Sequence, residues 1–273
     1  MSKLDLKPRA ARPVADWFSD VGAIITRNLQ GMRQTPDVLI WAMAQPIMFV
    51  LLFSQVYGGA IKVPGMDYTD FLMAGIFAQT MLFGSTFSGM FMAQDKKEGI
   101  IDRFRTLPMH DSAILFARTI SDMVLNAITI TVMVLCGFAV GWRFHEGIGS
   151  FVAGIGLLLL FAWAFSWVMV FLGLIVRSPE ALNSASFMVL FPLSFVSNAF
   201  VPSDTLPTAL RIFAEWNPVS ALVQAARVLF GNTGGTPAPD LWTMQHPVLA
   251  VLIGCVLVAG IFMPLSVLRF KRN

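Results

Sequence analysis

The sequence predicts an all-α integral membrane protein with six transmembrane helices, and three observations support this fold class. Hydrophobic residues make up 56% of the 273 residues and charged residues only 13%, whereas soluble domains contain about 25% charged residues. The uncharged runs are long and continuous rather than alternating, which is typical of membrane helices and not of a β-barrel. Lysine and arginine concentrate in alternate connections between these runs, which gives the predicted helices a direction across the membrane.

Residues 1–37 are predicted to form a cytoplasmic tail and an amphipathic helix. No apolar stretch longer than VGAII occurs here, so a cleaved signal peptide is not expected. Such a helix either lies in the cytoplasmic membrane interface or packs against a soluble partner, and we predict the interfacial position. The apolar side chains that recur at helical spacing are Val14, Trp17, Phe18, Val21, Ile24, Ile25 and Met32.

Residues 38–273 are predicted to form the membrane domain. A helix of about 20 apolar residues crosses a bilayer, and six uncharged runs meet this requirement: Val38–Ile61, Phe71–Gln94, Met123–Trp142, Gly147–Val176, Ala181–Ser203 and Leu241–Leu268. With six spans, both termini lie on the same side of the membrane. Only four of the 19 lysines and arginines fall on the opposite side, at Lys62, Arg143, Arg211 and Arg227. The positive-inside rule therefore places both termini in the cytoplasm.

The sequence lacks the residue patterns of a membrane enzyme. His110, His145 and His246 are far apart and show no metal-ligand spacing, and no Gly-x-Ser-x-Gly elbow occurs. Cys136 and Cys255 lie inside apolar runs, where we interpret them as small hydrophobic residues rather than a disulfide or metal site. No catalytic, metal or cofactor site is expected in this chain, and nothing in its charge distribution indicates nucleic-acid binding.

Two further features concern charge and ATP. Asp122 is the acidic residue closest to the interior of a span, and Arg118 lies one helical turn before it. We interpret this pair as an anchor at the cytoplasmic end of the third span.

The sequence also lacks a phosphate-binding loop, because none of its six lysines follows a glycine. If ATP powers this protein, another chain must bind the ATP and its Mg²⁺.

The connection at residues 94–112, between the second and third spans, contains the densest cluster of charge, QDKKEGIIDRFRT. A short helix is predicted here, with Ile100, Ile101 and Phe104 on one face and charges of both signs around them. Apolar anchors with a polar rim are typical of a protein-docking surface. An ordinary solvated loop would explain the lysines and arginines but not the apolar residues. The predicted docking residues are Glu98, Gly99, Ile100, Ile101, Asp102, Arg103, Phe104 and Arg105.

The connection between the fifth and sixth spans, at residues 204–232, is predicted to be a re-entrant pair of helices on the outer side. Its two apolar-rich pieces, Thr208–Glu215 and Val219–Phe230, are bounded by proline or glycine and are too short to cross a bilayer. Non-helical backbone at membrane depth needs cover from protein or a water-filled cavity. A plain surface loop would leave the apolar residues of both pieces unexplained.

Two groups of short motifs occur in order along the six spans. The first is an acidic residue and a glycine followed by an apolar pair and then Leu-Pro: Glu98, Gly99, Ile100, Ile101, Leu107 and Pro108. The second is a Phe-x-Pro, a Leu-Pro, an Asn-Pro and an Ala-x-Arg: Phe200, Pro202, Leu206, Pro207, Asn217, Pro218, Ala225, Ala226 and Arg227. Through these motifs nearly the whole chain resembles the membrane subunit of a type-2 ATP-binding-cassette exporter, in the branch that includes daunorubicin and doxorubicin permeases.

This resemblance implies a half-transporter in a bacterial plasma membrane. Two six-span subunits, identical or paired, would sit on two cytoplasmic ATPase chains that bind ATP and Mg²⁺, with residues 98–105 as the coupling helix. Members of the family move lipids, polysaccharides or lipophilic drugs outward. We expect a hydrophobic or amphipathic substrate, a drug or a lipid. The alternatives are an exporter of a polysaccharide or lipid-linked glycan, and a non-transporting scaffold or sensor.

The residues that contact substrate are expected to be apolar or aromatic, because no charged side chain lies in mid-membrane. Trp163, Trp167 and Phe171 share a face of the fourth span, which suits either a glycan pathway or contact with lipid. Amide side chains in the spans either contact substrate or hold helices together. The candidate amides are Gln45, Gln79, Asn126, Asn183 and Asn198.

Overall fold

The computed structural model describes residues 14–34, 36–56, 63, 65–106, 109–201, 203, 206–234 and 240–272. The regular structure of these residues is helical, with one isolated bridge between Val63 and Met66, so the all-α class is confirmed. The helices are α1 (Val14–Gln34), α2 (Pro36–Val56), α3 (Tyr68–Gly84), α4 (Thr86–Lys97), α5 (Ile100–Thr106), α6 (Asp111–Ala139), α7 (Ile148–Ile175), α8 (Pro179–Phe195), α9 (Thr208–Trp216), α10 (Pro218–Phe230), α11 (Trp242–Gln245) and α12 (Pro247–Arg272).

Four helical stretches in the described part of the chain are long and apolar enough to cross a membrane. They are Tyr68–Lys97, Asp111–Ala139, Ile148–Ile175 and Pro247–Lys271. The first consists of α3 and α4 together, and the others correspond to α6, α7 and α12. These four match the second, third, fourth and sixth predicted spans. The first predicted span, Val38–Ile61, falls partly outside the described residues, so the count of six spans stays a prediction.

The fifth predicted span is shorter in the structure than in the prediction. Helix α8 ends at Phe195, whereas the uncharged run extends to Ser203. The side chain of Asn217 explains this end, because its Nδ2 donates hydrogen bonds to the carbonyl oxygens of Leu193 and Val196, at 2.6 and 2.9 Å. A side chain thus satisfies carbonyls that the helix end leaves without partners. The prediction of a continuous helix is therefore wrong beyond Phe195.

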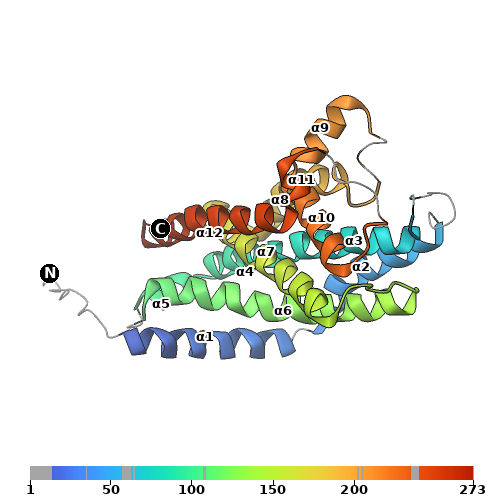
Figure 1. The fold of residues 1–273 in the computed structure, drawn as a ribbon. Helices are drawn as coiled ribbons and strands as arrows, with labels where there is room; N and C mark the ends of the chain where they lie inside the picture. Colours follow the sequence, from blue (N-terminus) through green and yellow to red (C-terminus); the bar gives the residue numbers. More distant parts are fainter. Residues whose placement is uncertain are drawn as a thin grey trace, which may run out of the picture.

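Helix α7 is central to the bundle, since it contacts α3, α4, α6, α8, α10 and α12. Figure 1 shows α6 and α12 extending along the long axis of the molecule, with α1 beside α6. The main apolar core is built largely from α3, α7 and α10. A second apolar cluster, around Trp167, joins α1, α4, α5, α6, α7 and α12.

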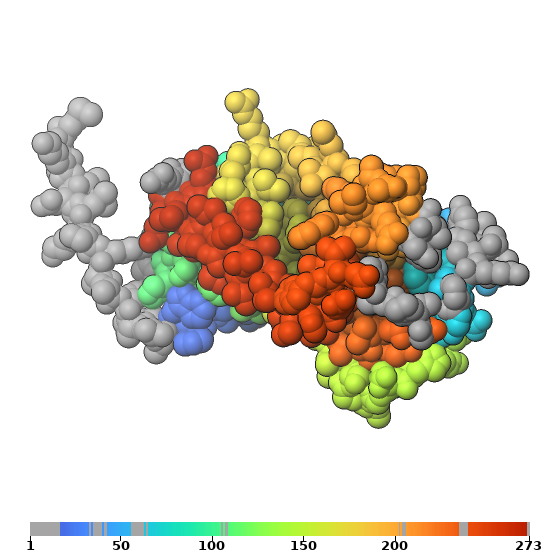
Figure 2. Space-filling model, turned by 45° about the horizontal axis from the view of Figure 1, so that its top comes forward, coloured from blue at the N-terminus to red at the C-terminus, as the bar shows by residue number. Residues whose placement is uncertain are grey.

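Helices α8 and α12 carry much of the exposed apolar surface. Met188 and Val189 are exposed on α8, and Val256 and Leu257 are exposed on α12. Figure 2 shows α12, in red, lying along the surface of the molecule. Apolar surface of this extent is expected where a membrane protein contacts lipid or a second subunit.

Helix α1 packs along α6, and part of its apolar side faces protein. Val21 and Ile24 are buried in the cluster around Trp167. Asn28 Nδ2 donates a hydrogen bond to Ser121 Oγ of α6 at 3.2 Å. The helix itself is confirmed, but the prediction that Val21 and Ile24 face the membrane interface is wrong. Helical spacing shows which side of a helix is apolar and does not show what covers it.

Helices α4 and α7 cross in direct backbone contact at two glycines. A Cβ atom added at Gly173 would lie 2.5 Å from the carbonyl oxygen of Gly89, and one added at Gly89 would lie 2.4 Å from that of Met169. Small residues let membrane helices approach each other closely. This crossing holds α4 against the central helix of the bundle.

We expect Gly173→Ala to destabilise the protein by about 1–3 kcal/mol, because the added methyl group overpacks a crossing without free space. Gly156→Ala on the same helix is the matched control, since an added Cβ there meets no atom within 4 Å. Thermal unfolding of the detergent-solubilised chain, followed by size-exclusion chromatography, compares the two variants. Equal unfolding midpoints would contradict this account of the crossing.

Candidate functional site

The stretch formed by α3 and α4 is interrupted, since α3 ends at Gly84 and α4 begins at Thr86. Two hydroxyl groups at this point bond back to the preceding turn. Ser85 Oγ donates to Leu82 O at 2.6 Å, and Thr86 Oγ1 donates to Phe83 O at 2.6 Å. Serine and threonine side chains that bond to a preceding carbonyl bend helices. The interruption lies beside a cavity.

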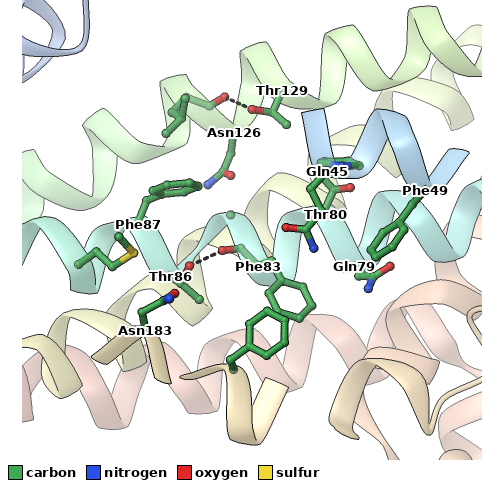
Figure 3. Close-up of a pocket in the computed structure, with 15 residues that line it drawn as sticks. Gln45, Phe49, Gln79, Thr80, Phe83, Thr86, Phe87, Asn126, Thr129 and Asn183 are labelled. Carbon is green, nitrogen blue, oxygen red and sulfur yellow. Dashed lines mark hydrogen bonds between the residues drawn. The ribbon is translucent and has the colours of Figure 1, made fainter. Parts of the chain in front are cut away.

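This cavity has a volume of about 430 Å³ and lies between α2, α3, α4, α6 and α8 (Figure 3). Ligand pockets typically span about 300–1,000 Å³, so the cavity suits a small molecule. None of its 15 described lining residues carries a charge. Its aromatic wall consists of Phe49, Phe83, Phe87 and Phe187. Its polar wall consists of Gln45, Gln79, Thr80, Thr86, Asn126, Thr129 and Asn183.

Two amides of the wall occupy unusual positions. Gln79 is 3% exposed, yet neither its amide nitrogen nor its amide oxygen has a hydrogen-bond partner in the described structure. A buried polar group without a partner costs about 1–3 kcal/mol. Asn126 of α6 places its Oδ1 only 2.2 Å from where a Cβ at Gly84 would lie, so the glycine leaves room for this side chain. Two helices thus bring amides to the same cavity.

The wall can bind and orient a molecule through hydrogen bonds and aromatic stacking. The described residues contain no group of three His, Cys, Asp or Glu side chains that could hold a metal ion. Cys136 on α6 is half-buried and Cys255 on α12 is buried, and both are free thiols. The size and the uncharged lining of the cavity suit a small molecule.

The connection between α4 and α6 contains the predicted short helix, α5, which follows Gly99 at a φ of +69°. Ile101 is 6% exposed and belongs to the cluster around Trp167. Phe104 packs against the same cluster, and the guanidinium of Arg27 lies 4.8 Å from its ring centre. The prediction that Ile101 and Phe104 form an exposed docking face is therefore wrong, because they anchor α5 to its own chain.

The exposed side of α5 and of the turn before it is polar rather than apolar. Ile100 is half-buried, and the exposed side chains among the described ones are those of Glu98, Asp102, Arg103 and Thr106. A partner that docks on this side would meet charges of both signs. The predicted residues that lie outside the described ones are the side chain of Arg105 and the pair Leu107 and Pro108.

Arg27 connects α5 to two further helices. It belongs to α1, lies over Phe104, and pairs with Asp95 of α4, with 3.6 Å between Nη2 and Oδ1. Helix α1 is also joined to the start of α6, because the backbone N–H of His110 donates to Asp20 Oδ2 at 3.1 Å. A displacement of α5 therefore acts on α1 and α4.

Arg118 and Asp122 form a buried ion pair on α6, one turn from Asn126 of the cavity wall. Their side chains are 8% and 1% exposed, and 3.9 Å separates Arg118 Nε from Asp122 Oδ2. Ser88 of α4 donates a hydrogen bond to the same carboxylate oxygen, and the Arg118 guanidinium lies 4.3 Å from the ring centre of Phe91. The interpretation as an anchor at a span end is corrected: the pair ties α4 to α6 inside the protein.

Arg227 of the Ala-x-Arg motif joins α10 to α3 and to the segment that follows α8, and we call this place the carbonyl junction. Its Nη2 donates to the carbonyl oxygens of Phe71, Asn198 and Ala199 at 3.1, 2.8 and 3.4 Å, and its Nε also donates to Phe71 O at 3.2 Å. Its Cζ lies 3.5 Å from the ring centre of Phe71. The motif singled out Arg227 but not its partners, because every residue type has a backbone carbonyl.

The predicted outer pair corresponds to α9 and α10, so two short helices in this connection are confirmed. Asn217 separates them: its Oδ1 accepts a hydrogen bond from Val219 N at 2.9 Å, and Pro218 begins α10. Helix α10 is largely buried against α3, α7 and α12, whereas α9 exposes Phe213 and Trp216. Their depth in the membrane, and hence the re-entrant geometry, stays a prediction.

The remaining outer motif residues are Phe200, next to the carbonyl junction, and Pro202, Leu206 and Pro207 further along the chain. Phe200 is buried, and its carbonyl oxygen accepts a hydrogen bond from Tyr68 Oη of α3 at 3.1 Å. Leu206 and Pro207 precede α9 directly. Pro202 lies outside the described residues. The described motif residues thus serve to position helices, and none of them lines the cavity.

Comparison with known proteins identifies the family. Residues 19–231 match the model of the ABC-2 type transporter family, and this stretch contains the cavity, α5 and Arg227. The chain belongs to the ABC-2 type transporter family. The resemblance predicted from the motifs is confirmed.

Several ABC-2 relatives carry transport names. The daunorubicin resistance ABC transporter permease protein DrrB1 of Streptomyces coeruleorubidus is 30% identical over 247 residues, covering 90% of this chain and 84% of the relative. The doxorubicin resistance ABC transporter permease protein DrrB of Mycobacterium tuberculosis is 24% identical over 216 residues, covering 79% and 74%. The putative transport permease ycf38 of Cyanophora paradoxa is 22% identical over 277 residues, covering 100% and 94%.

Four of the five candidate amides line the cavity of this ABC-2 chain. They are Gln45 of α2, Gln79 of α3, Asn126 of α6 and Asn183 of α8. Residue type suggested them, and only the packing of four helices brings them together. Asn198 does not join them. It lies at the carbonyl junction, where its backbone N–H donates to Ser220 Oγ at 3.1 Å.

The aromatic face of α7 is not part of the cavity. Trp167 is fully buried, with 4.9 Å between its ring and that of Phe116 on α6. The ring of Phe171 lies 5.7 Å from that of Phe262 on α12, and Trp163 packs against Trp167. Trp167 is therefore covered by its own chain, whereas Trp163 and Phe171 are half-buried, so the two interpretations of this face, as a glycan pathway or as a lipid contact, stay predictions for them.

Proposed function

We propose that this ABC-2 chain is the transmembrane subunit of an ATP-driven exporter that moves a hydrophobic or amphipathic molecule, a drug or a lipid, out of a bacterial cell. The cavity between α2, α3, α4, α6 and α8 is the observation that carries this proposal. Its wall combines phenylalanine rings with uncharged amides, as the binding of an amphipathic molecule requires. The drug-resistance permeases among the relatives support the same substrate class. The aromatic face of α7 gives less support to a glycan exporter, since Trp167 at its centre is fully buried.

The proposed exporter contains two membrane subunits, identical or paired, in the plasma membrane, and ATPase subunits that bind ATP and Mg²⁺. Family membership supports such partners in general. The lysine and arginine distribution supports an orientation with both termini in the cytoplasm. The chain itself is not an enzyme in this proposal, because it lacks a glycine–lysine phosphate-binding loop.

The ATPase subunit would dock on the polar side of α5. Asp102 and Arg103 are exposed there, while Ile101 and Phe104 fix the helix to its own chain. A short helix that is anchored on one side transmits a displacement, whereas an unanchored loop absorbs it. Because Arg27 links α5 to α4, the displacement would reach the helix whose first turn lines the cavity.

We expect the double reversal Asp102→Arg and Arg103→Glu to reduce the ATPase subunit recovered with the chain by about tenfold or more, because like charges that meet across an interface cost several kcal/mol. The tagged full-length chain is purified from its native membranes, and Mg²⁺-dependent ATPase activity in the eluate is measured. ATP-dependent uptake of a fluorescent amphipathic dye into inverted membrane vesicles is measured in parallel. Glu146→Lys, an exposed reversal in the connection from α6 to α7, should change neither quantity.

Ile101→Asp has a different expected result from the double reversal. It places a charge in the chain's own apolar cluster, so the yield of folded protein should fall.

Unchanged recovery of ATPase activity with the double reversal would contradict docking on α5. Vesicles that take up no dye with ATP, although the ATPase subunit is present, would contradict export of amphipathic molecules.

A further inference from the structure

We propose that the cavity selects uncharged, flat aromatic molecules that carry an N–H donor beside a carbonyl acceptor, as a lactam does, and that Gln79 recognises this pair. This inference rests on the proposed function only in treating the bound molecule as cargo. Gln79 is then the specificity-determining residue of a site that otherwise binds through shape and apolar contact. Three properties of the cavity support this assignment: its orphan amide, its uncharged wall and its aromatic rings.

The amide of Gln79 has donor and acceptor capacity that is unused in the described structure. Both of its polar atoms are buried and lack partners, and neither is open to the cavity in this conformation, so the side chain has to turn toward the cavity to pair with a ligand. A carboxamide presents N–H donors and a carbonyl acceptor in one plane. It therefore forms two parallel hydrogen bonds with an edge that offers an acceptor and a donor side by side, as glutamine does with adenine. A lactam has such an edge, and binding it removes the cost of an unpaired buried amide.

The uncharged wall favours a neutral ligand. None of the 15 described lining residues is an acid or a base. Asp122, one turn along α6 from Asn126, is 1% exposed and is already paired with Arg118. A cation in the cavity would lose water without gaining a counter-ion, which is costly. A neutral molecule avoids that cost.

The aromatic rings favour a flat ligand. Phenylalanines from four helices line the cavity, and the rings of Phe83 and Phe187 lie 5.7 Å apart. Figure 3 shows Gln79 next to Phe49. Aromatic faces stack on flat rings, but they also attract cations. The rings alone therefore do not discriminate between a lactam and an aromatic cation. The amide of Gln79 provides that discrimination.

Binding to the full-length chain in lipid nanodiscs tests this inference without ATP or a partner. The probe is 6(5H)-phenanthridinone, a neutral tricyclic lactam. Its N-methyl derivative keeps the shape and the carbonyl but lacks the N–H donor, and 5-methylphenanthridinium carries a fixed positive charge. Fluorescence titration gives each Kd, with empty nanodiscs as the reference for partition into lipid. We expect the lactam to bind about tenfold or more tightly than either analogue, because the N-methyl derivative leaves the amide oxygen unpaired and the cation leaves both amide atoms unpaired.

Substitution of Gln79 separates recognition by the amide from apolar binding. Gln79→Leu removes both hydrogen bonds at similar size, so it should abolish the preference for the lactam while the N-methyl derivative still binds. Gln79→Met provides a second variant of the same kind if Gln79→Leu does not fold. Gln224→Leu is the matched control, since Gln224 is half-buried on α10 and does not line the cavity. It should keep the full preference.

Several results would overturn this inference. They are equal binding of the lactam and its N-methyl derivative, tighter binding of the cation, a preference that survives in Gln79→Leu, or no lactam binding above empty nanodiscs. Each of these results would leave the proposed export function standing. Conversely, a lactam preference that depends on Gln79, in a chain whose vesicles show no ATP-dependent uptake, would support the binding site and overturn export.

Discussion

Arg227→Met should destabilise the chain by about 3–5 kcal/mol, because it removes the donors that hold α3, α10 and the segment after α8 together at the carbonyl junction. The guanidinium donates to the carbonyl oxygens of Phe71, Asn198 and Ala199. A methionine fills similar space but donates to none of them, so buried acceptors lose a charged partner. Thermal unfolding of the detergent-solubilised protein measures the loss.

Arg211→Met is the matched control for this substitution. Arg211 pairs with Glu215 at 2.7 Å, but its side chain is 47% exposed, so its loss should cost less than about 1 kcal/mol. Arg227→Lys should fall between the two, because an ammonium keeps the charge without the planar fork of donors. Equal unfolding midpoints for Arg227→Met and Arg211→Met would show that the junction does not depend on the guanidinium.

Asp122→Leu should cost about 3–5 kcal/mol, because it leaves the buried charge of Arg118 without its carboxylate partner. The double variant Arg118→Met, Asp122→Leu should recover most of this loss, since apolar residues often replace a buried ion pair at little cost. Unfolding of both single variants and the double variant measures the coupling between the two residues. Lys97→Ala, which removes an exposed partner of Glu180, should change stability little.

Additive effects in the double variant would contradict this prediction, because they would show that Arg118 and Asp122 do not act as a pair. The result also bears on the cavity, since Asp122 lies one turn from Asn126 and accepts a hydrogen bond from Ser88, next to Phe87. Loss of the pair is therefore expected to loosen α4 against α6 where both helices line the cavity.

The membrane-crossing stretches were predictable from the sequence because their signal is local. Helices α3 with α4, α6, α7 and α12 each consist of a long uncharged run, and hydrophobicity alone selects such runs. The end of α8 was not predictable in this way. The side chain that caps it belongs to Asn217, more than 20 residues further along the chain, and the uncharged run continues past the helix end.

In helix α5, too, the sequence predicted one property and the tertiary structure decided another. Its spacing predicted a short helix with an apolar face, and both exist. The same spacing suggested that the apolar face receives a partner, whereas Ile101 is already buried in the chain's own cluster around Trp167 and Arg27 of α1 lies over Phe104. An apolar face must be buried, and its own sequence does not state whether the cover comes from another protein or from the same chain.

By itself, the sequence determined the helical membrane class, the long helices, the short helices α5, α9 and α10, and the family. Each of these follows from patterns within one segment or from motifs in order. The tertiary structure alone decided that Gln45, Gln79, Asn126 and Asn183 meet at one cavity, that Arg227 gathers three carbonyls, and that Arg118 and Asp122 are enclosed. These contacts form between helices that are distant in the sequence. The type of a residue does not indicate which distant residues it will contact after packing.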